Sequence, residues 1–120
     1  MSSRRAEAER RGRRGETIAA CYLRLTGWRI LARRLKTRRG EIDLVARRGK
    51  IVCFVEVKWR SSAAEHGVAI DARRLRRVAA AAEALVPRYA RSGEDVRIDV
   101  ILLAPWCWPL RIVNAWQPGA

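Results

Sequence analysis

The sequence has few of the residues that histidine-dependent or thiolate chemistry requires. It contains one histidine, His66, and three cysteines, Cys21, Cys53 and Cys107, which form no C-x-x-C pair. One histidine excludes sites built on a histidine pair, and it leaves any Ser-His scheme dependent on a residue of an expected loop. Cysteines that are odd in number and lie among apolar neighbours indicate buried thiols in a reducing compartment. We therefore expect a cytoplasmic protein.

Long apolar runs are also missing. The first 14 residues are polar and basic, without the apolar core of a signal peptide, and the longest apolar stretch, 100–110, is broken by Pro105 and Pro109. Neither secretion nor a membrane span is predicted. A chain of 120 residues can bury a single hydrophobic core. We expect one domain over residues 1–120, in which residues 1–12 form a flexible basic arm.

Acidic residues are scarce. The chain has 12 of them against 26 basic residues, which gives a formal net charge of +14. This imbalance favours nucleic acid as a partner, because basic side chains that neutralise phosphates release condensed counterions. Ribosomal or anionic-membrane contact would suit the same charge, and a coding bias toward arginine would produce it without any partner. The charge therefore indicates a class of partner and not an activity.

Hydrophobic periodicity predicts two helices and five strands. Apolar residues at Ile18, Tyr22 and Leu25 have the spacing of a buried helical stripe, and the β-branched run 51–59 is the clearest strand. Pro87 should end or kink the second helix. The expected elements are a helix over 4–26, strands over 28–35, 41–47 and 51–59, a loop over 61–67, a helix from 68 or 71 to 86, and strands over 96–103 and 110–115. This order predicts an α/β fold with a mixed central sheet flanked by helices.

Charged residues interrupt the apolar strand 51–59 on one face. Side chains alternate along a strand, so Phe54, Glu56 and Lys58 share a face. An unpaired charge on such a strand would be costly. The same alternation puts Asp43 on one face of strand 41–47 with Glu41 and Val45. A tight turn joins the two strands, so Asp43 and Glu56 should converge at one end of the sheet.

Two carboxylates beside a lysine suit a hard cation such as Mg²⁺, which leaves positions for water and phosphate. Phosphodiester hydrolysis is the matching reaction, because carboxylates that face phosphate need a cation between them. The alternative is a cross-strand salt bridge of Lys58 with Glu56 or Asp43. Arginine supplies most of the positive charge, and the lysines are only Lys36, Lys50 and Lys58. A lysine at this position therefore suggests a need for a compact ammonium group.

Blocks along almost the whole chain match a known family. They are the segments 15–16, 22–23, 30–31, 40–46, 54–58, 97–100 and 114–115, together with Ala19, Gly27 and Arg60. The chain resembles the YraN-like family of bacterial proteins, which is similar to archaeal Holliday-junction resolvases and to the PD-(D/E)XK superfamily. The resemblance implies a restriction-endonuclease-like sandwich and a metal-dependent endonuclease acting on DNA. Branched and single-stranded DNA are then candidate substrates, and a homodimer is a candidate assembly.

The resemblance also implies roles for individual residues. Asp43 and Glu56 would bind Mg²⁺ or Mn²⁺, with the main-chain carbonyl of Val57 as a further ligand. Lys58 would be the catalytic lysine of the motif, and Glu16 would be a further acidic catalytic residue from the first helix. The chain departs from the pattern at Ile42, where the superfamily name has proline, at Arg34, where asparagine is frequent, and at Arg73 or Arg74, where lysine is usual. These departures leave the core carboxylates unchanged, so they put the family's substrate contacts in doubt more than its catalysis.

Arginine clusters are the candidate contacts to nucleic acid, and a solvated helix or loop surface is the alternative for each. The candidates are Arg38, Arg39, Arg60, Arg73, Arg74 and Arg77. Tryptophans at 59, 106, 108 and 116 could stack on unpaired bases, but in so small a domain we expect most to pack in the core or at a dimer interface. A second hypothesis for the chain is a nucleic-acid-binding module that retains the nuclease fold with little catalytic power.

Overall fold

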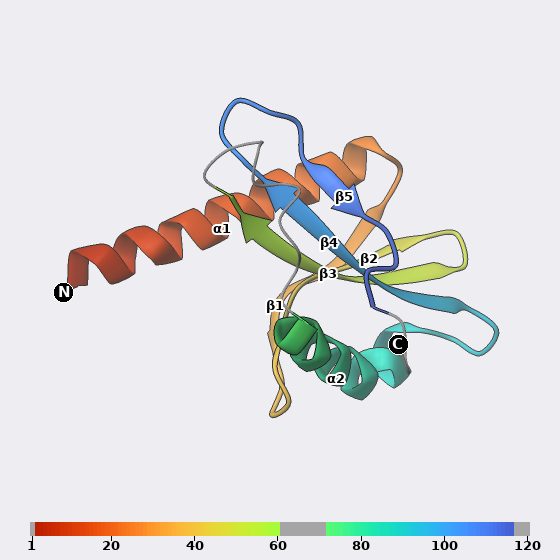
Figure 1. Ribbon diagram of the computed structural model, residues 1–120. Coiled ribbons are helices and arrows are strands. Elements are labelled where there is room, and N and C mark those ends of the chain that lie inside the picture. Colours follow the sequence, from red (N-terminus) through yellow and green to blue (C-terminus); the bar gives the residue numbers. More distant parts are fainter. Residues whose placement is uncertain (1, 61–71, 117–120) are drawn as a thin grey trace.

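The computed structural model describes residues 2–60 and 72–116. The elements are α1 (Ser2–Leu25), β1 (Arg29–Lys36), β2 (Glu41–Arg48), β3 (Ile51–Trp59), α2 (Ala72–Tyr89), β4 (Asp95–Leu103) and β5 (Leu110–Ile112). The strands form one sheet in the order β1-β2-β3-β4-β5. Figure 1 shows the sheet between the two helices. The predicted α/β fold with a mixed sheet flanked by helices is confirmed.

One parallel pair at the centre makes the sheet mixed. β3 runs parallel to β4 from Ile51 opposite Asp95 to Trp59 opposite Leu103, whereas the other neighbouring strands are antiparallel. A parallel pair needs a long crossover, and α2 lies in that connection. The hairpin between β2 and β3 turns at Gly49, whose φ of 61° is one that residues with a Cβ adopt rarely. The carboxyl ends of β3 and β4 therefore meet at one edge of the sheet.

Each helix covers one face of the sheet with its own hydrophobic cluster. On the α2 face, the expected stripe of Leu75, Val78, Ala82 and Leu85 is buried against the sheet. On the α1 face, the expected stripe is confirmed for Tyr22, which packs against the cluster, and is wrong for Leu25 and Ile18, which are 81% and 37% exposed. The helix instead buries Ala19, Ala20 and Leu23, and Cys21, which was expected to be buried, is exposed. Two adjacent alanines let the helix backbone approach the sheet closely, which larger side chains would prevent.

Other differences from the predicted elements are local. Residues 2–12, expected as an arm, are the start of α1. The second helix continues through Pro87 to Tyr89, because a proline near the end removes only one main-chain hydrogen bond of the last turns. β5 ends at Ile112 and not at 115, since Asn114 turns with a φ of 53°. The expected loop 61–67 and the expected helix starts at 68 and 71 lie outside the described residues.

A buried aspartate holds the β4–β5 end of the sheet. Asp99 has no exposed surface, and its Oδ1 accepts a hydrogen bond from the main-chain nitrogen of Asn114 at 2.8 Å. Its Oδ2 lies 3.5 Å from a guanidinium nitrogen of Arg97 and 3.8 Å from one of Arg111. The carboxylate therefore neutralises two partly buried arginines and fixes the turn after β5.

Replacing Asp99 with alanine should lower the free energy of unfolding by about 2–4 kcal/mol, because two guanidinium groups would lose their counterion and one main-chain donor its acceptor. The melting temperature should fall by on the order of 10 °C, measured by circular dichroism. Asp95→Ala is the matched control, since Asp95 is exposed on the same strand. Equal melting temperatures for the two variants would contradict this role of Asp99.

Candidate active site

The site begins where β2 separates from β3. The β2–β3 pairing runs from Arg48 opposite Ile51 to Leu44 opposite Val55, whereas β1 still pairs with Ile42 and Glu41. In the opening, Oδ2 of Asp43 accepts a hydrogen bond from the main-chain nitrogen of Val57 at 2.7 Å. The carboxylate thus takes the place of a main-chain partner for β3. This bond fixes Asp43 at the end of the paired region.

The separation also changes which way β2 side chains point. Ile42 packs in the α2-side cluster together with Val45, whereas Leu44 and Ala46 pack in the α1-side cluster. Regular alternation would have put Ile42 with Leu44, so the expected face of strand 41–47 is wrong at this end. The irregularity lies at Asp43, the residue that leaves the ladder.

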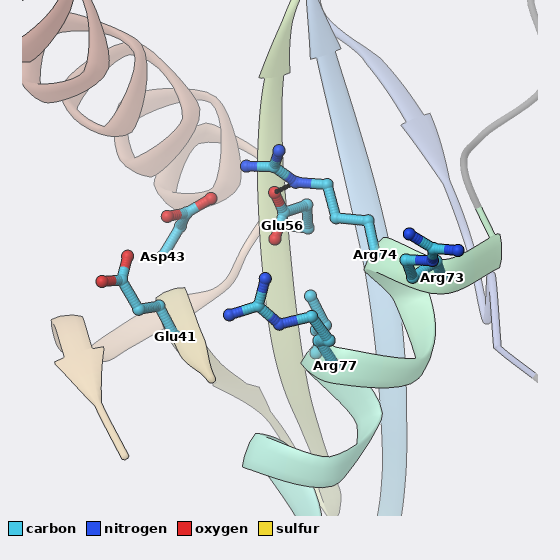
Figure 2. A pocket seen from close by; sticks show the side chains of 7 residues that line it. Glu41, Asp43, Glu56, Arg73, Arg74 and Arg77 are labelled. Carbon is cyan, nitrogen blue, oxygen red and sulfur yellow. Dashed lines mark hydrogen bonds and ion pairs between the residues drawn. The ribbon is translucent and has the colours of Figure 1, made fainter. Parts of the chain in front are cut away.

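Glu56 lies on the face of β3 that α2 covers, as expected from its position two residues after the buried Phe54. It is 6% exposed, and its Oε1 accepts a hydrogen bond from Nε of Arg74 at 2.9 Å. Figure 2 shows this ion pair between the strand and the first turns of α2. Lys58 follows on the same strand, and its positive charge is among the causes that lower the pKa of Glu56. The structure therefore brings Glu56, Lys58 and Arg74 together.

Burial dominates the ionisation of both carboxyl groups. Loss of water raises the pKa of Asp43, and the hydrogen bond from Val57 and the charge of Arg74 oppose that rise in part. Loss of water also raises the pKa of Glu56, and the nearby charge of Asp43 raises it further. Arg74 opposes both effects on Glu56. Two carboxylates that repel each other in a poorly hydrated place would both be stabilised by a cation between them.

Glu16 approaches from α1 on the other side of Asp43. It is 7% exposed, and its Oε1 forms an ion pair with Nε of Arg34 at 3.2 Å that lacks hydrogen-bond geometry. Burial raises the pKa of Glu16, the charge of Arg34 lowers it, and the charge of Asp43 raises it. The two acids are thus close enough to interact, which places Glu16 beside the carboxylate pair.

Two cavities meet at Asp43 and Glu41. One, of about 390 Å³, is also lined by Glu56, Arg73, Arg74, Arg77 and Val78. The other, of about 340 Å³, is also lined by Arg13, Glu16, Arg34, Leu35, Lys36 and Ile42. Figure 2 shows the carboxylates of Glu41 and Asp43 on one side of the first cavity and the α2 arginines across from them. The arrangement is an open acidic centre with a basic rim.

Gly40 keeps the acidic and basic sides of the first cavity close together. A Cβ at Gly40 would lie 2.9 Å from the main-chain oxygen of Arg77, so the β1–β2 turn packs directly on the backbone of α2. The next residue, Glu41, lines both cavities and was missed as a site residue. Its position two residues before Asp43, on the same face of a regular strand, was the feature of the sequence that could have identified it. Arg34 was also missed as a partner of Glu16, and its φ of 55° cannot be read from sequence.

Three of the expected nucleic-acid contacts do not line these cavities. Arg39 forms an exposed ion pair with Glu83 at 3.8 Å, and Arg38 is exposed in the same turn. Arg60 follows β3, and its main-chain nitrogen donates to the oxygen of Leu103 at 2.7 Å. None of these three arginines lines the two cavities. Over residues 2–60 and 72–116, no group of three or more histidine, cysteine, aspartate or glutamate side chains could hold a metal ion.

A solved structure shares this architecture. The solved structure of Hjc from Archaeoglobus fulgidus, a Holliday junction resolvase from an archaeal hyperthermophile, matches with a TM-score of 0.59 and 17% sequence identity, over 84% of this chain and 75% of that one. At that identity the likeness concerns the fold. The protein therefore has a restriction-endonuclease-like fold.

Sequence comparison gives the family. The model of "Uncharacterised protein family UPF0102" matches residues 15–103. A UPF0102 protein of Erythrobacter litoralis is 65% identical over 96% of this chain and 99% of its own length, and one of Rhizorhabdus wittichii is 62% identical over 96% and 98%. The chain belongs to the UPF0102 family, which confirms the YraN-like resemblance. Among the described residues, no helix is long and apolar enough to cross a membrane.

The ion pair of Arg74 with Glu56 predicts a change in two pKa values. Because the charge of Arg74 lowers the pKa of both Glu56 and Asp43, Arg74→Gln should raise both pKa values. The measurement is an NMR titration of the carboxyl carbons. Arg76→Gln is the control, because Arg76 is exposed on the same helix and lines neither cavity. Unchanged pKa values in Arg74→Gln would show that the ion pair does not persist in solution.

Proposed function

We propose that this protein is a metal-dependent endonuclease that hydrolyses phosphodiester bonds of DNA. The observation that carries the proposal is a pair of carboxylates, the partly buried Asp43 and the buried Glu56, whose pKa values desolvation raises and which lie near Lys58 and the α2 arginines. The net charge of +14 favours a polyanionic substrate. The fold shared with a protein described as a Holliday junction resolvase supports the same reaction class.

The residues fit Mg²⁺ or Mn²⁺. Carboxylate oxygens are the hard ligands that these ions prefer, and Mg²⁺ is commonly held by one or two carboxylates while water and phosphate complete its shell. Asp43 and Glu56 supply such a pair, and the charge of Asp43 raises the pKa of Glu56, which a cation would reverse. The main-chain carbonyl of Val57 is proposed as a further oxygen ligand. As pH rises, metal binding should therefore strengthen together with the loss of the protons from the carboxyl groups of Asp43 and Glu56.

The chain's own groups have separate tasks in this mechanism. A bound divalent ion would supply Lewis acidity and lower the pKa of a water molecule. Asp43 is kept in position by the main-chain nitrogen of Val57. Lys58 would orient the attacking water or donate to the phosphate oxygen that gains charge. Glu16 adds negative charge on the α1 side, and Arg73, Arg74 and Arg77 would bind phosphates of the DNA backbone.

A nucleic-acid-binding module without catalysis is the second candidate. The observation that favours it is the Arg74 ion pair, which gives Glu56 a cationic partner within the chain. In that case a divalent-ion titration would leave the NMR signals of Asp43 and Glu56 unchanged. In the nuclease, Mg²⁺ would shift both signals and displace Arg74 toward the phosphates.

Asp43→Asn and Glu56→Gln should each reduce Mg²⁺-dependent DNA cleavage by roughly a hundredfold or more, the scale of a lost catalytic group. DNA affinity should stay equal or rise slightly, because each change removes a negative charge that faces phosphate. Cleavage is measured on linear, nicked, flapped and four-way DNA, and affinity by fluorescence anisotropy. Asp95→Asn, an exposed change at the start of β4, is the control. Cleavage by both variants at the control's rate would exclude this site.

Lys58→Arg separates catalysis from a structural ion pair. An ion pair with Glu56 should tolerate arginine, which keeps the charge and adds donors. A catalytic ammonium should not, because the larger planar guanidinium cannot occupy the same point beside water and phosphate. We expect unchanged melting temperature and DNA affinity with cleavage reduced by roughly a hundredfold or more. A variant that folds and cuts as fast as the wild type would make Lys58 a scaffold residue.

A further inference from the structure

Two tryptophans are almost fully exposed in the chain that follows the carboxyl end of β4. Trp106 and Trp108 are 103% and 81% exposed in the connection between β4 and β5. The other tryptophans pack as expected, since Trp28 is buried and Trp59 and Trp116 contact the two core clusters. The packing expected for most tryptophans is therefore wrong for this pair. Pro105 and Pro109 enclose the segment and restrict its backbone.

The pair borders an apolar groove. A cavity of about 520 Å³ is lined by Ile18 of α1, by Trp59 and Leu103 at the ends of β3 and β4, and by residues 104–109. The helix comes very close to Trp59, because a Cβ on Gly15 would lie 2.6 Å from the indole nitrogen Nε1. α1 and the carboxyl ends of the central strands therefore form the walls of the groove.

The groove and the candidate active site share two elements. Trp59 directly follows Lys58 and lies three residues after Glu56, which corresponds to about 10 Å along a strand. On α1, Gly15 contacts Trp59 while the next residue, Glu16, interacts with Asp43. About three stacked nucleotides would span that length, at roughly 3.4 Å each. Because Glu56 faces α2 and Trp59 faces α1, a strand bound at the carboxylates would reach the groove by passing around the carboxyl end of β3, on the side where Glu16 of α1 lines a cavity with Asp43.

Basic residues flank the apolar surface. Arg14 lies four residues before Ile18 and so on the same side of α1. Arg60 follows Trp59, and its buried Nε has no hydrogen-bond partner in the described part of the chain. Aromatic faces beside cationic groups are the combination that binds single-stranded nucleic acid, since bases stack and phosphates are neutralised. A second copy of the chain is a less favourable occupant of the groove, because each copy has a net charge of +14 and the two would repel each other.

We propose that Trp106, Trp108 and the groove over Trp59 bind unpaired nucleobases by stacking, next to the carboxylate site. The position relative to cleavage rests on the proposed nuclease function, whereas the binding itself does not. The surface would direct the protein toward DNA that has a single-stranded segment adjoining a duplex. Stacking on an indole does not depend on base identity, so the preference would be for structure and not for sequence.

The test compares single-stranded and duplex DNA of equal length, bound to the full chain in the presence of a chelator. Trp106→Ala/Trp108→Ala should weaken single-strand binding by on the order of tenfold or more and duplex binding by less than about threefold. Leu25→Ala is the matched control, because Leu25 is an apolar residue as exposed as Trp108. Equal single-strand affinity in wild type and double variant would overturn the proposal. Loss of a wild-type dimer in the double variant would also overturn it, in favour of an interface between copies.

A second measurement on the wild type covers the case in which the double variant does not fold. A single strand containing 5-bromodeoxyuridine is cross-linked by light, and the attached residues are identified by mass spectrometry. Cross-links at Trp106 or Trp108 are expected, and cross-links confined to other residues would overturn the proposal. Because no metal is needed, a protein that binds in this way but never cleaves DNA would contradict the proposed function and leave the groove assignment standing.

Discussion

The hydrogen bond between Oδ2 of Asp43 and the main-chain nitrogen of Val57 is the constraint on which the site depends. It forms because β2 leaves the ladder one residue before the pairing of Leu44 with Val55. A main-chain nitrogen inside a sheet needs an acceptor, and a carboxylate supplies one with a full negative charge. The opening between β2 and β3 therefore fixes the carboxylate of Asp43 in place near Glu56.

The arginines around this opening offset the negative charge of the site carboxylates. Glu56 has Arg74 as its partner and Glu16 has Arg34, so each acid is neutralised by a neighbour from another element. Burial nevertheless raises the pKa of all three site carboxyls. In the proposed function, a site with this balance would be tolerated without metal and would still be stabilised by an added cation. The same arginines, once displaced by a cation, would be available to phosphate.

Sequence patterns were sufficient for the type and order of the elements and for the α2 face, because the period of Leu75, Val78, Ala82 and Leu85 follows directly from helix geometry. They also placed Glu56 and Phe54 on one face of β3. They failed at two places. The alternation of β2 side chains breaks at Asp43, whose carboxylate replaces a main-chain partner of β3. On α1, small alanines face the sheet, and a hydrophobic stripe of larger residues does not predict them. Glu41 was visible in the pattern but had no distinguishing chemistry until the cavities showed its place.

The parallel pairing of β3 with β4 connects the acidic centre to the tryptophan pair. Because the two strands run in the same direction from Ile51 and Asp95, both end at one edge, and the chain that leaves β4 must turn there. The segment 104–109 makes that turn, so its exposed indoles lie beside the end of β3 that carries Lys58. An antiparallel pair would have put this turn at the opposite end of β3. The topology thus brings an ionic surface and an aromatic surface to the same end of β3, and in the proposed complex the phosphates of a nucleic-acid strand would contact the first and its bases the second.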